Sequence, residues 1–249
     1  MKIASWNIWE SQMGMPQRRV QIFKEICALD AQVLCLQEFA DVQLLRWIKE
    51  RGLYSCFHRN EAEGLLVLSQ YPVDAVYLWP FAAAVQIKAQ GREILIVNLH
   101  LPWDGALKRE NAIVGLVAQA LQIQVDFIFF CGDFNCSADS AVQHFLLGDQ
   151  SLLGCETCFF DLAEAYASIS GVPAPCTLDF RKNPRWQVGQ AKAANTIERN
   201  QRFDRILLRN PYPADFPFLK EVGIFGERKS VDSGYAPSDH YGVYAQLVW

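Results

Sequence analysis

The sequence predicts one α/β domain with mixed, largely antiparallel sheets and helices packed on their outer faces. The expected strands and helices interleave without the strict alternation that builds a doubly wound parallel sheet. Several expected strands are joined by short turns that contain proline or glycine, as antiparallel neighbours usually are. The 249 residues contain no linker-like change of composition, so we expect a single domain over residues 1–249.

The first half of the chain alternates short apolar runs with two amphipathic segments. Gln17 to Leu29 has helical periodicity, with Val20, Phe23 and Ile26 on its apolar face, and Val42 to Lys49 forms a second helix that Gly52 closes. The expected strands of this half are Lys2 to Trp6, Ala31 to Leu36, Gly64 to Leu68, Ala75 to Leu78, Phe81 to Ile87 and Ile94 to Leu99.

The second half begins with the longest helical pattern, Leu107 to Gln124. A buried strand over Phe127 to Cys131 follows, and then a helix over Ala138 to Leu147 with Ser137 as its expected cap. The last clear strands are Phe203 to Leu208 and Gly242 to Val248, and the proline-rich stretch between them, Pro211 to Pro217, is typical of a turn.

Composition limits the classes of function. The net charge is -4, so any binding of a polyanion requires a local basic patch or a metal ion. Among the eight cysteines, Cys155 and Cys158 form one C-x-x-C with no second pair and no neighbouring His, which is a weak zinc or redox signal. Cys27, Cys35 and Cys131 lie in apolar runs, so we expect mostly reduced, structural thiols. The sequence contains no signal segment and no membrane-length apolar run, which predicts a cytoplasmic protein without a membrane partner.

Polar side chains follow several strands at the point where each strand ends. They are Asn7, Glu38, His100, Asp133, Asn135, Asp204, Asp239 and His240. Each residue alone has an ordinary explanation as a turn, cap or solvated residue. Together, carboxylates and amides that converge at sheet ends indicate an oxygen-rich site for Mg²⁺ or Mn²⁺, because zinc would favour Cys and His at ligand spacing.

Six short motifs in order along the chain resemble those of the endonuclease/exonuclease/phosphatase superfamily, the group of deoxyribonuclease I. They are Ser5-Trp6-Asn7, Leu36-Gln37-Glu38, Asn98-Leu99-His100, Gly132-Asp133-Phe134-Asn135, Arg202-Phe203-Asp204-Arg205-Ile206 and Ser238-Asp239-His240. The resemblance covers nearly the whole chain. It implies a four-layer α/β/β/α sandwich, a Mg²⁺-dependent phosphoesterase activity and a monomer.

The resemblance also implies the ligands of the metal and the groups that act on water. Glu38 is expected to be the main metal ligand, with Asn7 and Asp239 close by or joined through water. Asp133 is expected to orient or deprotonate the attacking water, and Asn135 to bind a phosphate oxygen.

Two histidines complete the implied site. Asp204 is expected to hold His240 by a hydrogen bond, so that His240 assists at the phosphate. His100 occupies a second histidine position near the phosphate or the leaving group, and Glu63 could orient it. Arg109, on the helix after His100, is expected either to contact phosphate or to be solvated.

The later motifs look like those of the tyrosyl-DNA phosphodiesterase 2 branch, which implies a nucleic-acid phosphodiester as substrate. Two departures stand against a tyrosyl substrate: Leu178 replaces an aromatic residue, and Asn7 is followed by Ile8-Trp9-Glu10 instead of Asp-Gly. Residues 181 to 202 have a basic excess and contain Trp186, so this segment could bind nucleic-acid phosphates and stack a base, or be a solvated loop.

Three other functions remain open from the sequence. The first is a phosphoesterase that acts on a small molecule or a phospholipid. An apurinic-type endonuclease is disfavoured by His100, since that branch generally has a tyrosine near this position. A catalytically silent binding module of the same fold would be expected to lose Glu38, Asp133 or His240, and all three are present.

Overall fold

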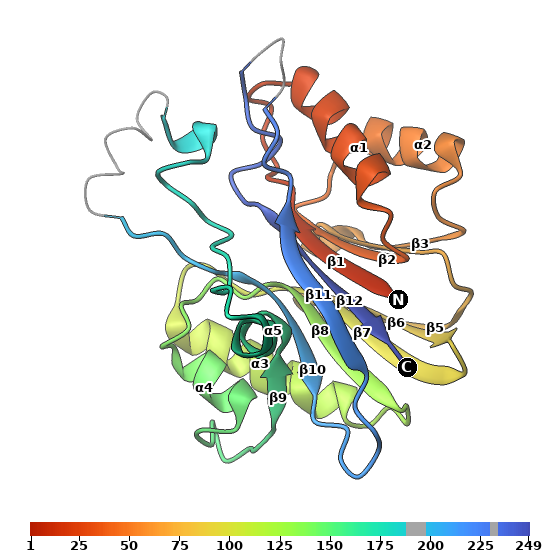
Figure 1. The fold of residues 1–249 in the computed structure, drawn as a ribbon, viewed down its shortest axis with the longest axis vertical. Helices are drawn as coiled ribbons and strands as arrows, with labels where there is room; N and C mark the ends of the chain where they lie inside the picture. The colour runs from red at the N-terminus through yellow and green to blue at the C-terminus, as the bar shows by residue number, and fades with distance from the viewer. Residues whose placement is uncertain (188–197, 230–233) are drawn as a thin grey trace.

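The protein is described by a computed structural model that covers residues 1–187, 198–229 and 234–249 (Figure 1). Two six-stranded sheets form its centre. The first sheet has the order β11-β12-β1-β2-β4-β3 and contains β1 (Lys2–Asn7), β2 (Val33–Gln37), β3 (Cys56–Asn60), β4 (Leu65–Ser69), β11 (Phe218–Phe225) and β12 (Gly242–Val248). The second has the order β5-β6-β7-β8-β10-β9 and contains β5 (Val73–Trp79), β6 (Ala82–Ala89), β7 (Arg92–His100), β8 (Phe127–Asp133), β9 (Phe159–Asp161) and β10 (Asp204–Arg209).

The sheets pack face to face, and helices cover their outer faces. One apolar cluster joins the inner faces, with Ile3 and Val33 from the first sheet against Ile96 and Phe129 from the second. Outside the first sheet lie α1 (Gln17–Leu29) and α2 (Val42–Arg51), and outside the second lie α3 (Ala106–Ala120) and α4 (Ala141–Leu147) (Figure 1). The predicted four-layer α/β/β/α sandwich with mixed sheets is therefore confirmed.

Two parallel strand pairs determine where polar side chains meet. β1 and β2 run parallel and pair Asn7 with Gln37, which places Glu38 just beyond the end of β2. β7 and β8 run parallel and pair His100 with Asp133, while antiparallel β10 pairs Asp204 with the same Asp133. All other strand pairs between named strands are antiparallel within the described residues.

Several elements differ from the sequence predictions. The strands β3, β9 and β11 and the helix α5 (Leu162–Ser170) were not predicted. β3 and β11 lie at edges of their sheet and most of their side chains are only partly buried, so they lack the continuous apolar runs of the central strands. The predicted cap Ser137 is wrong, because α4 begins at Ala141 and the hydroxyl of Ser140 accepts the hydrogen bond from the Gln143 amide.

Other features match the sequence predictions or differ from them by a few residues. α3 ends at Ala120, four residues before the predicted end at Gln124. α1 buries Ile22, Ile26 and Leu29, whereas Val20 is exposed. All eight cysteines are free thiols. No helix in the described part of the chain has the length and apolar character needed to cross a membrane.

Candidate active site

The predicted polar residues gather where the ends of β1, β2, β7, β8 and β10 approach the loop before β12. Gly132 makes one of these approaches possible. A Cβ atom at this position would lie 1.9 Å from the Leu99 carbonyl oxygen, so only glycine allows β8 to pass this close to β7. The close pairing brings His100 beside Asp133, and their Nε2 and Oδ2 atoms lie 3.6 Å apart.

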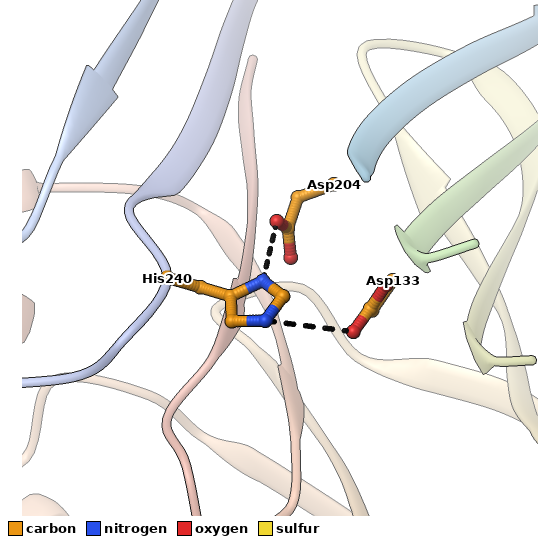
Figure 2. A group of neighbouring side chains, drawn as sticks. All are labelled: Asp133, Asp204 and His240. Atoms are coloured by element: carbon orange, nitrogen blue, oxygen red, sulfur yellow. Dashed lines mark hydrogen bonds and ion pairs between the residues drawn. The ribbon is translucent and has the colours of Figure 1, made fainter. Parts of the chain in front are cut away.

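His240 lies between two carboxylates, as Figure 2 shows. Its Nδ1 atom is 2.8 Å from Oδ2 of Asp204, and its Nε2 atom is 4.0 Å from Oδ2 of Asp133. The hydrogen bond to Asp204 fixes the ring and leaves Nε2 directed toward Asp133. Ser238 holds this segment in place, because its hydroxyl donates to the Asn7 carbonyl at 2.7 Å and accepts from the His240 amide at 3.1 Å.

Charge dominates the electrostatics of this group. Burial alone would lower the pKa of His240, but the carboxylates of Asp204, Asp133 and Asp239 outweigh burial and raise it well above the usual value. Burial raises the pKa of Asp204, and His240 opposes that rise. These carboxylates therefore favour the charged, doubly protonated form of the imidazole, in which Nε2 is a donor.

The ligand atoms of Asp133, Asp204 and His240 lie within 4.8 Å of one another, a spacing that a metal ion could bridge. A direct hydrogen bond explains this geometry better, because Nδ1 of His240 and Oδ2 of Asp204 are already hydrogen-bonded to each other at 2.8 Å. We therefore interpret these three residues as a group that transfers protons, and not as the metal ligands.

Asn7 connects the two sheets at the centre of the site. Its Nδ2 atom donates to Oε1 of Glu38 at 3.0 Å and to Oδ2 of Asp133 at 3.1 Å. Its Oδ1 atom accepts from the Trp9 amide at 3.0 Å, and the amide of Glu10 donates to Oε2 of Glu38 at 2.8 Å. The amide of Asn7, which is itself 1% exposed, thus holds both carboxylates in fixed positions.

Two site residues have a left-handed backbone that non-glycine residues rarely adopt. The φ angle is 53° at Glu38 and 48° at Asn135. Such a conformation costs on the order of 1 kcal/mol and persists where neighbouring contacts enforce it. The Asn135 amide donates to Oδ1 of Asp133 at 2.8 Å, and its Nδ2 donates to the Leu101 carbonyl at 2.9 Å. The hydrogen bonds from Asn7 and from the Glu10 amide hold Glu38 in the same way.

The residues present fit a hard divalent cation. Glu38 and Asp239 are close enough for Glu38 to add to the effect of burial in raising the pKa of Asp239. A cation between the two carboxylates would relieve this repulsion, and oxygen ligands suit Mg²⁺ or Mn²⁺. Asn7 lies beside Glu38 and could contribute its carbonyl oxygen or a bridging water.

For three further predicted residues, the contacts in the structure do not establish the predicted role. Arg109 donates through one terminal nitrogen to the carbonyls of Pro102 and Trp103, both at 3.1 Å, so this contact supports the loop after His100. Trp186 donates its indole N–H to the Asp239 carbonyl at 3.2 Å and packs on Phe180. A substrate contact by Arg109 or Trp186 remains a prediction. Within the described residues, Glu63 forms no hydrogen bond with His100.

The basic segment 181–202 is described only in part, since residues 188–197, including Lys192, lie outside the described residues. Arg202 forms ion pairs with Asp161, at 2.6 Å, and with Glu164, so carboxylates already balance its charge.

Sequence reasoning missed two residues that position the site. The Thr177 hydroxyl accepts from the amides of Phe203 and Asp204, both at 3.1 Å. Asn183, which is fully buried, donates through Nδ2 to the carbonyls of Ser238 and Asp239 at 3.0 and 3.1 Å. Neither follows a predicted strand end, so the pattern of polar residues at strand ends did not identify them.

Comparison with known proteins agrees with this geometry. Residues 4–240 match the model of the endonuclease/exonuclease/phosphatase family. No curated protein matches the chain significantly.

Several solved structures share the fold. D. rerio TDP2 complexed with single strand DNA product has a TM-score of 0.77 and 19% identity, covering 100% of this chain and 99% of that chain. Truncated Caenorhabditis elegans TDP2 has a TM-score of 0.75 and 18% identity, with coverages of 100% and 97%. SmcL has a TM-score of 0.66 and 17% identity, with coverages of 100% and 99%. The resemblance to the tyrosyl-DNA phosphodiesterase 2 branch agrees with these neighbours, and the family match, which spans nearly the whole chain, shows that this protein belongs to the endonuclease/exonuclease/phosphatase family of phosphoester hydrolases.

Proposed function

We propose that this protein is a Mg²⁺-dependent phosphodiesterase that hydrolyses phosphoester bonds in DNA, as a nuclease or an enzyme similar to 5′-tyrosyl-DNA phosphodiesterase. One observation carries the proposal. The Asn7 amide bonds both Glu38, on the side of the expected metal ligands, and Asp133, on the side of the His240–Asp204 pair. Metal binding and proton transfer would therefore act on the same phosphate.

Glu38, Asp239 and Asn7 would hold Mg²⁺, or Mn²⁺ in its place. When bound, the ion neutralises phosphate charge and polarises the phosphate oxygens. The chain's own contribution is to fix the ligands beforehand. Glu38 accepts hydrogen bonds from Asn7 and from the backbone amide of Glu10, so its carboxylate needs little rearrangement when it binds.

Asp133 and Asn135 would act on the attacking water. Oδ1 of Asp133 accepts from the Asn135 amide and Oδ2 accepts from Asn7, so the carboxylate is held but retains acceptor capacity for a water proton. The Asn135 side chain amide, anchored on the Leu101 carbonyl, would present its remaining polar atoms to a phosphate oxygen.

His240 would donate a proton or a hydrogen bond from Nε2 to a phosphate oxygen, because Nδ1 is occupied by Asp204. His100, whose side chain is 21% exposed, would act from the other side of Asp133 on the phosphate or the leaving group. These two histidines and the metal ligands would surround the phosphorus from separate strands.

DNA as the substrate is supported by two observations. The solved structure of D. rerio TDP2 with single strand DNA product has the same fold over the whole chain. Arg185 lies in a turn that Asn183 attaches to the Ser238 and Asp239 carbonyls, and it supplies local positive charge near an expected metal ligand in a chain of net charge -4.

A substrate panel tests the proposal. The purified protein would be assayed with Mg²⁺ against bis-(p-nitrophenyl) phosphate, a 5′-tyrosyl oligonucleotide, an abasic duplex, an inositol phosphate and sphingomyelin. We expect EDTA-sensitive hydrolysis of bis-(p-nitrophenyl) phosphate and of at least one DNA substrate. Cleavage of the lipid or the inositol phosphate alone would refute the DNA assignment, and no hydrolysis of any substrate would favour a binding module.

A further inference from the structure

Two arginines contact the ring of Trp9, one of the residues at which the first motif departs from its usual sequence. The guanidinium carbon of Arg18 lies 4.3 Å from the ring centroid and that of Arg185 lies 4.4 Å from it. Such contacts are favourable, because the aromatic face attracts a cation and the flat guanidinium can lie against it. Trp9 itself has a φ angle of 57°, so its position is enforced by its surroundings.

The two arginines use their donors differently. Arg18 is fully buried and donates to five backbone carbonyls, which belong to Ile8, Trp9, Ser11, Met13 and Pro237. Arg18 therefore has a structural role in shaping the loop after β1. The buried Nε of Arg185 has no hydrogen-bond partner, and no carboxylate of the described residues forms an ion pair with this side chain. Its terminal nitrogens have no hydrogen-bond or ion-pair partner among the described residues, so they remain available to a ligand.

The position of Arg185 is also set by the site. Asn183 accepts from the Arg185 amide at 3.0 Å, while its own amide donates to the carbonyls of Ser238 and Asp239. The short turn that carries Arg185 is thus attached to the Ser238-Asp239-His240 segment. A second aromatic ring, that of Trp186, has its centroid 5.3 Å from the Arg185 guanidinium carbon.

Arg185 lies on one flank of the site. The turn that carries it is hydrogen-bonded to the Asp239 carbonyl through the side chains of Asn183 and Trp186, so Arg185 lies next to an expected metal ligand. A planar cation whose terminal nitrogens are unpaired among the described residues, next to an expected metal ligand, suits an anion adjacent to the reacting one.

We propose that Arg185, held against Trp9, binds the phosphate next to the scissile phosphate, so that the enzyme selects substrates in which a second phosphate follows along a nucleic-acid strand. This inference rests on the proposed function and refines its substrate class. Arg18 and Asn183 would act as positioning residues, because they hold Trp9 and the Arg185 turn.

Three p-nitrophenyl esters test the proposal. The first is the 5′-ester of thymidine monophosphate, which has one phosphate, and the second is the same ester on a thymidine dinucleotide. The third carries an uncharged methylphosphonate in place of the internucleotide phosphate. We expect the wild-type kcat/KM to be about tenfold or more higher for the charged dinucleotide than for either other ester, the size of one charge-assisted hydrogen bond.

The variant Arg185→Gln should remove that preference, mainly through a higher KM for the charged dinucleotide. Arg185→Lys, which keeps the charge but loses the planar fork, should retain only part of it. The matched control is Arg209→Gln, which removes an exposed charge at the far end of β10 and should keep the preference. The slope of log KM against log salt should also fall by about 0.7 in Arg185→Gln, as expected for one lost contact with a single strand.

Two results would overturn the inference while leaving the proposed function intact. One is a preference for the charged dinucleotide that persists in Arg185→Gln, and the other is an equal loss on all three esters, which would place Arg185 at the scissile phosphate or in folding alone. If the wild-type enzyme hydrolyses none of the nucleotide esters or the DNA substrates, the proposed function and the inference both fail.

Discussion

The side-chain amide of Asn7 donates hydrogen bonds to both Glu38 and Asp133, at 3.0 and 3.1 Å. Glu38 follows the last residue of β2 in one sheet and Asp133 ends β8 in the other, so a single amide joins the two halves of the candidate site. Several consequences of this arrangement can be measured.

Replacing Asn7 by alanine removes the donor that Glu38 and Asp133 share. We expect kcat/KM for bis-(p-nitrophenyl) phosphate to fall by about 10²–10³-fold, similar to the loss of one preorganised donor at a reacting centre. The matched control Asn111→Ala removes an exposed asparagine from α3 and should leave activity unchanged. An Asn7→Ala enzyme with wild-type activity would contradict the proposed role.

Replacing His240 by alanine removes the proposed donor to the phosphate. Turnover should fall by about 10²–10⁴-fold, the usual contribution of a positioned acid or base, while the circular dichroism spectrum remains native. His144→Ala is the control, because His144 lies on α4 and pairs with Asp149, away from the site. The assignment of His240 is wrong if both variants retain the same turnover.

Asp204 and His240 should behave as one unit, because Asp204 acts through the imidazole it holds at 2.8 Å. Asp204→Asn should lower turnover strongly, and the double variant Asp204→Asn/His240→Ala should be no slower than His240→Ala alone. Kinetic constants for the three variants form the test. Multiplicative losses in the double variant would show that Asp204 has a separate function.

Glu38→Gln should weaken metal binding even when no substrate is present. The melting temperature of the wild-type protein should rise with added Mg²⁺ because the folded state alone binds the ion, and that rise should be reduced or absent in the variant. Glu50→Gln, an exposed change on α2, serves as the control and should keep the wild-type response. A Mg²⁺-induced shift of equal size in Glu38→Gln would exclude Glu38 as the principal ligand.

Thr177→Val removes the hydroxyl that accepts from the buried amide of Asp204 and from the Phe203 amide. Leaving a buried donor unpaired costs about 1–3 kcal/mol, so we expect the melting temperature to fall by about 2–10 °C. Thr157→Val is a suitable control, because the buried hydroxyl of Thr157 has no hydrogen-bond partner among the described residues and its removal should not destabilise the fold. Equal melting temperatures for the two variants would argue against the Thr177 contact.

The fold was predictable where local sequence and tertiary environment agree. Val33–Gln37 and Phe127–Asp133 are buried along their whole length, and their apolar runs identified them as central strands. The edge strand Phe218–Phe225 is only partly buried over most of its length, so its residues carry no equivalent pattern. The helix Leu162–Ser170 buries only Leu162 and Ala163, which left a weak periodic signal.

The sequence by itself determined which chemical groups this protein can place at its strand ends, because the ordered motifs from Asn7 to His240 can be identified without coordinates. Only the tertiary structure decided which groups touch. Asn7 and Asp133 are 126 residues apart in sequence, and Asn183 and Ser238 are 55 residues apart. Arg185 and Trp9 lie in opposite halves of the chain. The physical reason is that such contacts depend on strand register and on packing between two sheets, which no local pattern of residues encodes.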